Sequence, residues 1–312
     1  MARRGNRRRA ERPGASGFVV VDKPAGWTSH DVVDAARGWF GTRRVGHLGT
    51  LDPLATGVLP LAIRGATKLV PYVQNRAKGY AGAIRLGVVT DTLDAEGRVL
   101  RESSGPWPDE ARVEEAMQGF IGEQEQVPPM FSAVKKDGVP LHKLAREGLE
   151  VPREPKRVRV DRFALRKYDP PRLEIEVECS GGTYVRVLAA DLGERLGCGA
   201  HLADLRRTRS GPFTLAEACS PETLREEAEA GEVERRLVSP LAALGLPALR
   251  LSADEVAQIV QGSEIAADGP AGVPGAQIVG HDEQGRVVAV LELRPGRRLR
   301  PLRVLEPFAG RG

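Results

Sequence analysis

The chain has 312 residues, 41% of them hydrophobic, which is enough for a large folded domain with a smaller one beside it. Its three cysteines show no C-x-x-C spacing, which argues against a disulfide framework or a zinc ribbon, and no apolar run reaches the length of about 18 residues needed for a membrane span. The net charge of +4 is too small to identify a nucleic-acid partner.

The basic residues are mostly arginine, because only eight of the 46 are lysines. Arginine suits phosphates and bases in RNA, and a GC-rich genome explains its excess equally well. The first segment, Arg3 to Arg12, is basic without an apolar stretch, so it is not a signal peptide. We expect residues 1–15 to be a disordered basic tail and the protein to be cytoplasmic.

The first predicted elements alternate between buried strands and helices. Gly17–Lys23 is a β-branched run typical of a buried strand, and Thr28 can cap a helix that runs to about Phe40. The most regular strand is Arg172–Cys179, in which apolar and glutamate side chains alternate strictly, as in a half-buried antiparallel sheet. The same reasoning predicts strands over 58–63 and 80–86, a turn at 94–97, and helices over 109–120 and 183–196, the last ending at Gly197.

Residues 126–155 form a different kind of segment, polar, basic and rich in proline, with one short helix over about 141–146. We interpret it as an inserted, mobile arm, because insertions of this length in compact domains are usually functional or disordered. Residues 239–247 are predicted to be a linker. One helix within 249–262 and strands over 276–279, 286–293 and 300–304 predict a small β-rich C-terminal domain.

The segment from Gly46 to Gly57, GHLGTLDPLATG, is the strongest candidate for a functional site. An aspartate before a proline, as in Asp52-Pro53, is common in a simple turn. Three glycines within twelve residues, however, allow the backbone to approach a ligand closely. A carboxylate presented there could act as a nucleophile or stabilise an oxocarbenium-like sugar. His47 has no second ligand at zinc-binding spacing.

This segment resembles the catalytic motif of TruB-type pseudouridine synthases. Further matches occur in the expected order, and the resemblance covers roughly residues 17 to 240. They are DKPAG from Asp22, VPPMFSA from Val127, CSGGTYVR from Cys179 and LRRT from Leu205.

The resemblance implies an α+β fold, in which a mixed or antiparallel central β-sheet is flanked by helices. It places the catalytic domain at residues 16–245, with the arm at about 126–155. Residues 248–312 resemble a small PUA-like RNA-binding domain more weakly.

The implied activity is isomerisation of uridine 55 in the T loop of tRNA, without metal or other cofactor. Asp52 is implied to attack or assist at the ribose–uracil junction, after which the base turns over and C5 rejoins the sugar. Tyr80 matches the tyrosine that stacks on the target base. Arg206 matches the active-site arginine, which would keep the neighbouring carboxylate ionised. His47 would fill the space left by the flipped nucleotide.

Other residues are implied to contact substrate. Lys23 and Tyr184 would shape the pocket or hold the catalytic loop, Leu205 would contact substrate, and Arg207 would bind phosphate. The arm would contact phosphates through Lys135, Lys136, Lys143 and Arg146, and the C-terminal domain would hold the acceptor end of tRNA through Arg294, Arg297, Arg298 and Arg300.

Guide-RNA-dependent relatives share the G-H-x-G-T-L-D-P motif but usually continue it with a basic residue, whereas this chain has Leu54-Ala55, and they lack the long arm. A stand-alone monomeric enzyme that acts on tRNA without guide RNA is therefore expected. Two alternatives remain: an RNA chaperone whose chemistry is secondary or lost, and a nucleoside hydrolase. The hydrolase would need a second carboxylate to activate water.

Overall fold

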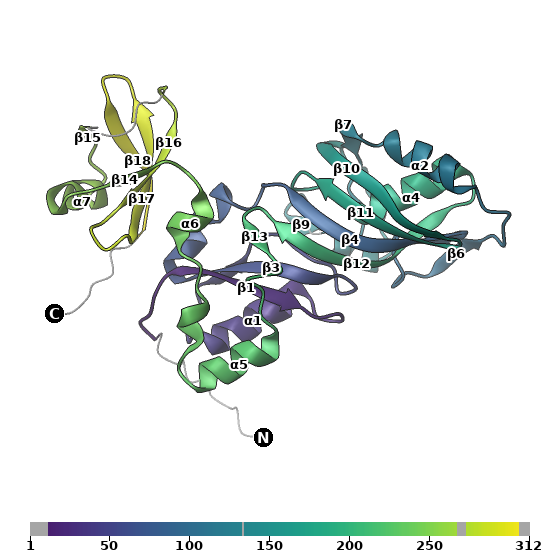
Figure 1. Ribbon diagram of the computed structural model, residues 1–312, viewed down its shortest axis with the longest axis horizontal. Helices are drawn as coiled ribbons and strands as arrows, with labels where there is room; N and C mark the ends of the chain where they lie inside the picture. Colours follow the sequence, from purple (N-terminus) through teal and green to yellow (C-terminus); the bar gives the residue numbers. More distant parts are fainter. Residues whose placement is uncertain (1–11, 133, 267–272, 306–312) are drawn as a thin grey trace.

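The computed structural model describes residues 12–132, 134–266 and 273–305 (Figure 1). Residues 1–11 of the predicted basic tail lie outside this range. Residues 12–15, at the end of the predicted tail, are in contrast held against the folded chain. The Arg12 amide donates to the Gly41 carbonyl at 2.9 Å, and Arg64 donates to the Ala15 carbonyl at 2.9 Å. The prediction of disorder is therefore wrong for residues 12–15.

The main sheet has nine strands in the order β1-β3-β12-β4-β11-β10-β7, with β2 paired to β3 and β13 paired to β12. Every pairing is antiparallel except the short contact between β3 and β12, so the sheet is mixed, as predicted. The strands are β1 Gly17–Lys23, β2 Val45–His47, β3 Thr56–Ile63, β4 Lys78–Leu86, β7 Gly122–Gln126, β10 Lys156–Asp169, β11 Arg172–Cys179, β12 Ala200–Ser210 and β13 Phe213–Thr214.

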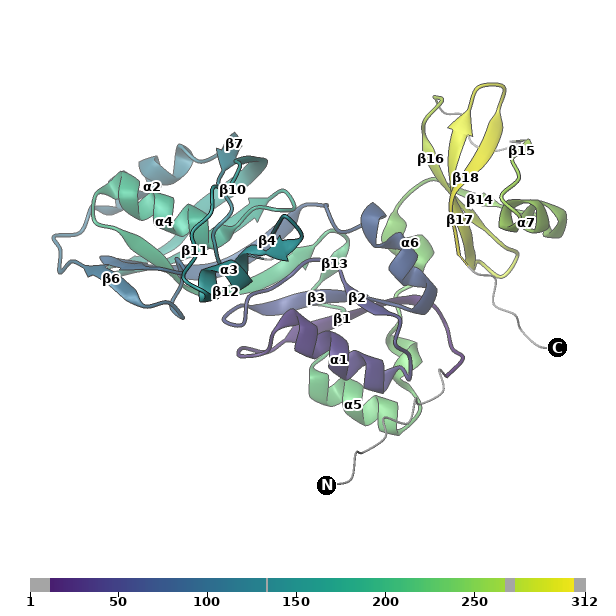
Figure 2. The same cartoon turned by 180° about the vertical axis from the view of Figure 1, so that it is seen from behind.

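Helices cover the main sheet in two groups (Figures 1 and 2). The helices α1 (Ser29–Trp39) and α5 (Pro221–Glu229) lie side by side near β1, whereas α2 (Glu110–Gln118) and α4 (Val185–Leu196) pack against β10 and β12. The predicted helix ends agree with the structure where the capping residue lies beside the helix in the sequence. Thr28 forms a capping box at the start of α1, and Gly197 ends α4 in the left-handed conformation.

The remaining elements of the catalytic region are short. They are the ribbon of β5 (Val88–Thr90) and β6 (Val99–Glu102), the ribbon of β8 (Lys135–Lys136) and β9 (Val139–Pro140), the helix α3 (Leu141–Arg146), and the 3-10 helices η1 (Arg64–Tyr72) and η2 (Val233–Arg236). The ribbon of β8 and β9 and the helix α3 belong to residues 126–155, which therefore carry one short helix, as predicted.

A second sheet follows, with strand order β14-β16-β17-β18-β15, and confirms the predicted β-rich C-terminal region. The predicted linker contains a helix, α6 (Pro240–Leu244), capped by Ser239 and ended by Gly245. Its Leu244 packs with Phe18 of β1 and Val290 of β17 in one core cluster, so the two sheets are joined by buried apolar contacts. The other elements are β14 Ala248–Arg250, α7 Ala253–Val260, β15 Ile265–Ala266, β16 Gln277–His281, β17 Val287–Arg294 and β18 Arg298–Val304.

The strand β12 was not predicted from the sequence, although it lies in the middle of the main sheet. Its sequence, AHLADLRRTRS, is charged and has no strict alternation, because two bulges interrupt its pairing with β4. The parallel contact with β3 aligns Gly57 with Arg207. Gly57 has φ +95°, and a Cβ there would lie 2.2 Å from the Arg207 carbonyl oxygen, so only glycine permits this approach.

Replacing Gly57 with alanine should therefore destabilise the protein by about 3 kcal/mol, since both the positive φ and the backbone clash oppose a side chain. Urea denaturation followed by circular dichroism measures the change. The matched control is Gly38→Ala in α1, where a Cβ meets nothing within 4 Å, and we expect it to stabilise the helix by up to about 1 kcal/mol. Equal stability of the two variants would contradict this account of the strand junction.

Candidate active site

The loop between β2 and β3 carries Asp52 and ends at the point where β3 meets β12. Three buried groups hold its backbone. Arg207 donates to the carbonyls of Gly49 at 3.1 Å and Thr50 at 3.3 Å, and also to Val58 at 2.6 Å. Lys23 donates to the Pro53 carbonyl at 3.2 Å. The loop is thus held on both sides of Asp52.

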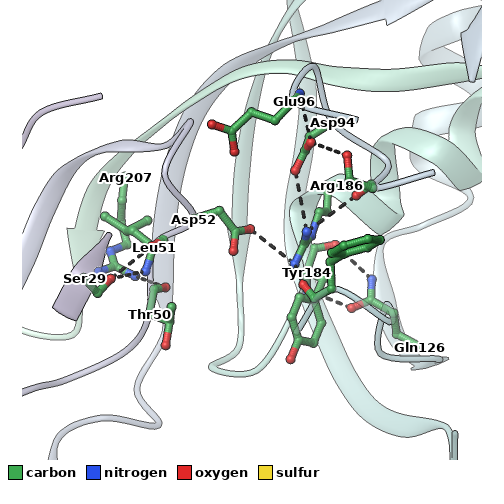
Figure 3. Close-up of polar contacts among 12 residues, drawn as sticks. Ser29, Thr50, Leu51, Asp52, Asp94, Glu96, Gln126, Tyr184, Arg186 and Arg207 are labelled. Carbon is green, nitrogen blue, oxygen red and sulfur yellow. Dashed lines mark hydrogen bonds and ion pairs between the residues drawn. The ribbon is translucent and has the colours of Figure 1, made fainter. Parts of the chain in front are cut away.

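Ser29 at the start of α1 supplies the third contact. Its hydroxyl accepts from the Leu51 amide at 2.8 Å and donates to the Leu51 carbonyl at 3.0 Å. Because Ser29 is buried, its hydroxyl binds the backbone in place of water. The residue before Asp52 is therefore fixed at both backbone polar groups, which sets the direction of the Asp52 side chain (Figure 3).

Arg186, in the first turn of α4, is the ion-pair partner of Asp52. Its guanidinium lies 3.3 Å from Asp52 Oδ2 and 3.5 Å from Asp94 Oδ2, so it stands between two carboxylates (Figure 3). It also donates to the carbonyl of Phe131, and its side chain is 5% exposed. Asp94 is held in turn by the Thr92 hydroxyl at 2.5 Å.

The pKa of the Asp52 carboxyl reflects opposing influences. Desolvation by the surrounding protein raises it and is the largest cause, while the positive charge of Arg186 lowers it and the negative charge of Asp94 raises it. The net shift is upward. Arg186 therefore offsets part of the cost of keeping an ionised carboxylate in a partly desolvated pocket.

The structure corrects the predicted role of Arg206. Its guanidinium forms a bidentate pair with Asp22, at 3.0 and 2.8 Å, rather than with Asp52. Alternation along β12 explains the difference, because Leu205 faces the pocket and Arg206 faces the opposite side of the strand. The arginine beside the carboxylate is Arg186, the last residue of the CSGGTYVR motif. This motif is the feature of the sequence from which Arg186 could have been predicted.

A pocket opens beside Asp52 and brings together four of the predicted residues, Asp52, Tyr80, Tyr184 and Leu205. Tyr80 is 7% exposed, and its hydroxyl bonds to Arg207, while burial raises the pKa of the phenol and keeps it neutral. Several other residues of the wall had no role predicted from the sequence. The complete lining is Gly49, Thr50, Leu51, Asp52, Ala55, Lys78, Tyr80, Ser132, Gly182, Thr183, Tyr184, Val185, Arg186, Leu202 and Leu205.

Three predicted substrate contacts lie outside this lining. Lys23 and Arg207 are both fully buried, and their donors are directed at backbone carbonyls. Phosphate binding by the Arg207 side chain is therefore wrong for this structure, whereas Lys23 contacts the backbone of the loop that carries Asp52. His47 lies at the end of β2, where its Nδ1 accepts from the Gly49 amide at 3.4 Å. Burial and neighbouring cations lower the pKa of His47, so the ring is neutral at pH 7.

The arm reaches the site through its first residues. Gln126 pairs with the backbone of Tyr184 in both directions, at 2.8 and 3.2 Å, and Ser132 lines the pocket. The predicted phosphate-binding residues Lys135, Lys143 and Arg146 are exposed, and Lys136 donates to the Pro152 carbonyl. Their contact with RNA remains a prediction.

Within the described part of the chain, no group of three or more His, Cys, Asp or Glu side chains is arranged to hold a metal ion. No helix within the same residues is long and apolar enough to cross a membrane.

Arg186→Gln should raise the pKa of Asp52 further, because the cation that favours its ionised form is lost while burial and Asp94 remain. The carboxyl would then lose its proton only at a higher pH. Carbon-13 NMR titration of the labelled aspartate carboxyl measures this directly. Arg206→Gln is the matched control and should leave the Asp52 titration unchanged, since Arg206 pairs with Asp22. A shift in the control alone would restore the original assignment.

Comparison with known families matches almost the whole catalytic region. Residues 37–185 match the family described as TruB family pseudouridylate synthase (N terminal domain), and residues 186–244 match the tRNA pseudouridylate synthase B C-terminal domain. The chain is 44% identical over 300 residues to tRNA pseudouridine synthase B of Geobacter sulfurreducens, covering 92% of this chain and 99% of that protein. It is 42% identical to the protein of the same name from Pseudomonas aeruginosa, covering 93% and 96%.

Solved structures share the fold at lower identity. A Cbf5–Nop10–Gar1 complex contains a chain that is 26% identical, with a TM-score of 0.71, covering 93% of this chain and 85% of that one. An H/ACA RNP bound to a substrate RNA containing 2′-deoxyuridine contains one that is 24% identical, with a TM-score of 0.70 and the same coverage. These similarities confirm the predicted pseudouridine-synthase fold.

Proposed function

The chain belongs to the TruB family of pseudouridylate synthases, and from this premise we propose that it acts on uridine 55 in the T loop of tRNA with Asp52 as its catalytic group. The relatives support a coarser statement directly: the protein is an enzyme that isomerises a uridine of tRNA to pseudouridine. We further propose that it does so as a monomer and without a guide RNA.

The reaction conserves every atom of the nucleotide. The C1′–N1 bond breaks, the uracil turns, a C1′–C5 bond forms, C5 loses a proton and N1 gains one. Asp52 can bond to C1′ or remove a proton from C2′ to give a glycal, and in both routes its carboxylate must be ionised at the start. The Arg186 ion pair favours this charged form and offsets part of the desolvation that raises the pKa of Asp52.

The pairing of Asp52 with Arg186 inside a pocket is the observation that carries the proposal. Tyr80 and Leu205 form part of the wall and offer a planar ring and an apolar surface to a flipped uracil. Among the described residues that line the pocket, Asp52 alone carries a carboxylate, so a water-activating base is missing. Isomerisation is therefore favoured over hydrolysis of the glycosidic bond.

We propose that two outlying surfaces hold the rest of the tRNA, the arm at the T stem-loop and the C-terminal sheet at the acceptor end. The arm offers exposed Lys135, Lys143 and Arg146. On the C-terminal sheet, Arg294 and Arg300 pair with Glu292, and Arg298 pairs with Glu264. These arginines are partly exposed, so a phosphate can approach them while competing with the glutamates.

The direct test is to incubate the purified protein with an unmodified tRNA transcript, without metal or guide RNA, and to map pseudouridine at nucleotide resolution. We expect conversion at uridine 55 of the T loop alone. Conversion at a different position would overturn the proposed target. Tight binding without conversion would favour the chaperone alternative.

Asp52→Asn should reduce pseudouridine formation by at least about 10³-fold while changing the Kd for tRNA by less than about threefold, because the amide keeps the shape but removes the charge. Single-turnover assays and filter binding measure the two quantities. Asp34→Asn is the matched control, since Asp34 lies 55% exposed on α1, and it should alter neither. Retained turnover in Asp52→Asn would remove Asp52 from the mechanism.

A further inference from the structure

Lys78 is a buried cation in the pocket wall to which the reaction scheme gives no role. It is the first residue of β4, on the same face of the strand as Tyr80, and is 9% exposed. A Cβ placed on Gly49 would lie 2.9 Å from Lys78 Nζ, so the ammonium lies against the catalytic loop. The part of the pocket wall beside Gly49 is thus positively charged.

No anion in the described residues neutralises this charge. Lys78 Nζ forms no hydrogen bond or ion pair with any of them, and the charged side chain with the largest influence on its pKa is another cation, Arg207. Burial and the nearby Arg207 lower the pKa of Lys78 to about 8, so it is still mostly protonated at pH 7. Cys179, opposite Lys78 on β11, is a neutral thiol because burial raises its pKa to about 11.

No neighbouring side chain that the structure describes is free to neutralise Lys78, since Arg207 is itself a cation and Asp52 already has a partner. The guanidinium of Arg207 is directed at the carbonyls of Gly49, Thr50 and Val58. The carboxylate of Asp52 is paired with Arg186 and is not among the groups that influence the pKa of Lys78. A desolvated ammonium beside a second cation is costly unless an anion binds to it, so the arrangement suits a negatively charged group of the ligand.

We propose that Lys78 binds the backbone phosphate flanking the target uridine when that nucleotide is flipped into the pocket. This inference rests on the proposed function, which supplies an RNA nucleotide as the ligand. Uracil and ribose are neutral, so the flanking phosphodiester is the anionic group that a flipped nucleotide brings with it. Exposed arm lysines can attract RNA before flipping, whereas Lys78 gains its partner only when the nucleotide enters.

The test is a double-mutant cycle between Lys78 and single phosphates. T stem-loop RNAs carry a neutral methylphosphonate at one linkage at a time around uridine 55, and the Kd of each is measured by filter binding. Lys78→Met should weaken binding of the unmodified RNA by about tenfold, as expected for a charge-assisted hydrogen bond. One flanking methylphosphonate should cost the parent protein a similar factor and cost Lys78→Met less than about threefold.

Lys167→Met is the matched control, because Lys167 lies on β10 with its side chain 59% exposed and outside the pocket lining. We expect it to leave every Kd unchanged. Additive losses at all flanking linkages would overturn the inference. Should Lys78→Met fail to fold, a parent protein that binds every flanking methylphosphonate RNA as tightly as the unmodified RNA would overturn it as well.

The salt dependence gives a second readout, since loss of one phosphate contact should reduce the slope of log Kd against log salt concentration by about 0.7 to 0.9.

Failure of the proposed function is separable from failure of this inference. A parent protein that converts uridine 55 but shows additive losses contradicts the role of Lys78 alone. A coupled loss in a protein that converts no uridine would support the phosphate contact and contradict the proposed reaction.

Discussion

The buried guanidinium of Arg207 is the contact on which the geometry of the active site depends. It joins the middle strand β12 to the loop that carries Asp52 and to β3 through three backbone carbonyls, and its own backbone lies against Gly57. A fully buried cation is costly unless its donors are satisfied, and these carbonyls satisfy them. Because they come from both ends of the loop, the same contacts that stabilise the cation also fix the loop that presents Asp52.

The charges around the pocket are arranged by sign. Asp52, Arg186 and Asp94 form one group with more negative than positive charge, while Lys78 and Arg207 form a second group of two cations beside Gly49. A nucleotide undergoing glycosidic cleavage has the matching polarity, because positive charge develops at C1′ and the phosphate remains negative. The two groups therefore suit the two ends of one nucleotide, and a neutral wall of Tyr80 and Leu205 suits its base.

Local signals predicted much of the fold, and contacts between distant residues account for what was missed. Strict alternation identified Arg172–Cys179 to the residue, and the Thr28 cap and Gly197 stop identified two helix ends. The strand β12 escaped prediction because its residues are charged and its bulges break the alternation, while the sheet around it supplies the partners. Asp94 was predicted only as part of a turn, since its pairing with Arg186 joins residues 92 positions apart in the chain.

The same dependence on contacts between distant residues explains why Arg206, and not Arg186, was predicted as the partner of the carboxylate. The motif around Leu205 indicated which segment reaches the site, but the face of a strand is decided by its register against β3 and β4. A shift of one residue moves a side chain to the opposite face of the sheet. Sequence similarity therefore located Asp52, Tyr80 and Leu205 at the pocket and left the partner of the carboxylate to be found from coordinates.

The hydrogen bond from Arg186 to the carbonyl of Phe131 connects the arm to the carboxylate, because one guanidinium holds both. Thermodynamic linkage makes such a connection reciprocal. An arm displacement that moves Arg186 away from Asp52 would raise the pKa of Asp52, and protonating Asp52 would then favour that displaced arm by the same free energy. Through Arg186, the position of the arm and the pKa of Asp52 depend on each other.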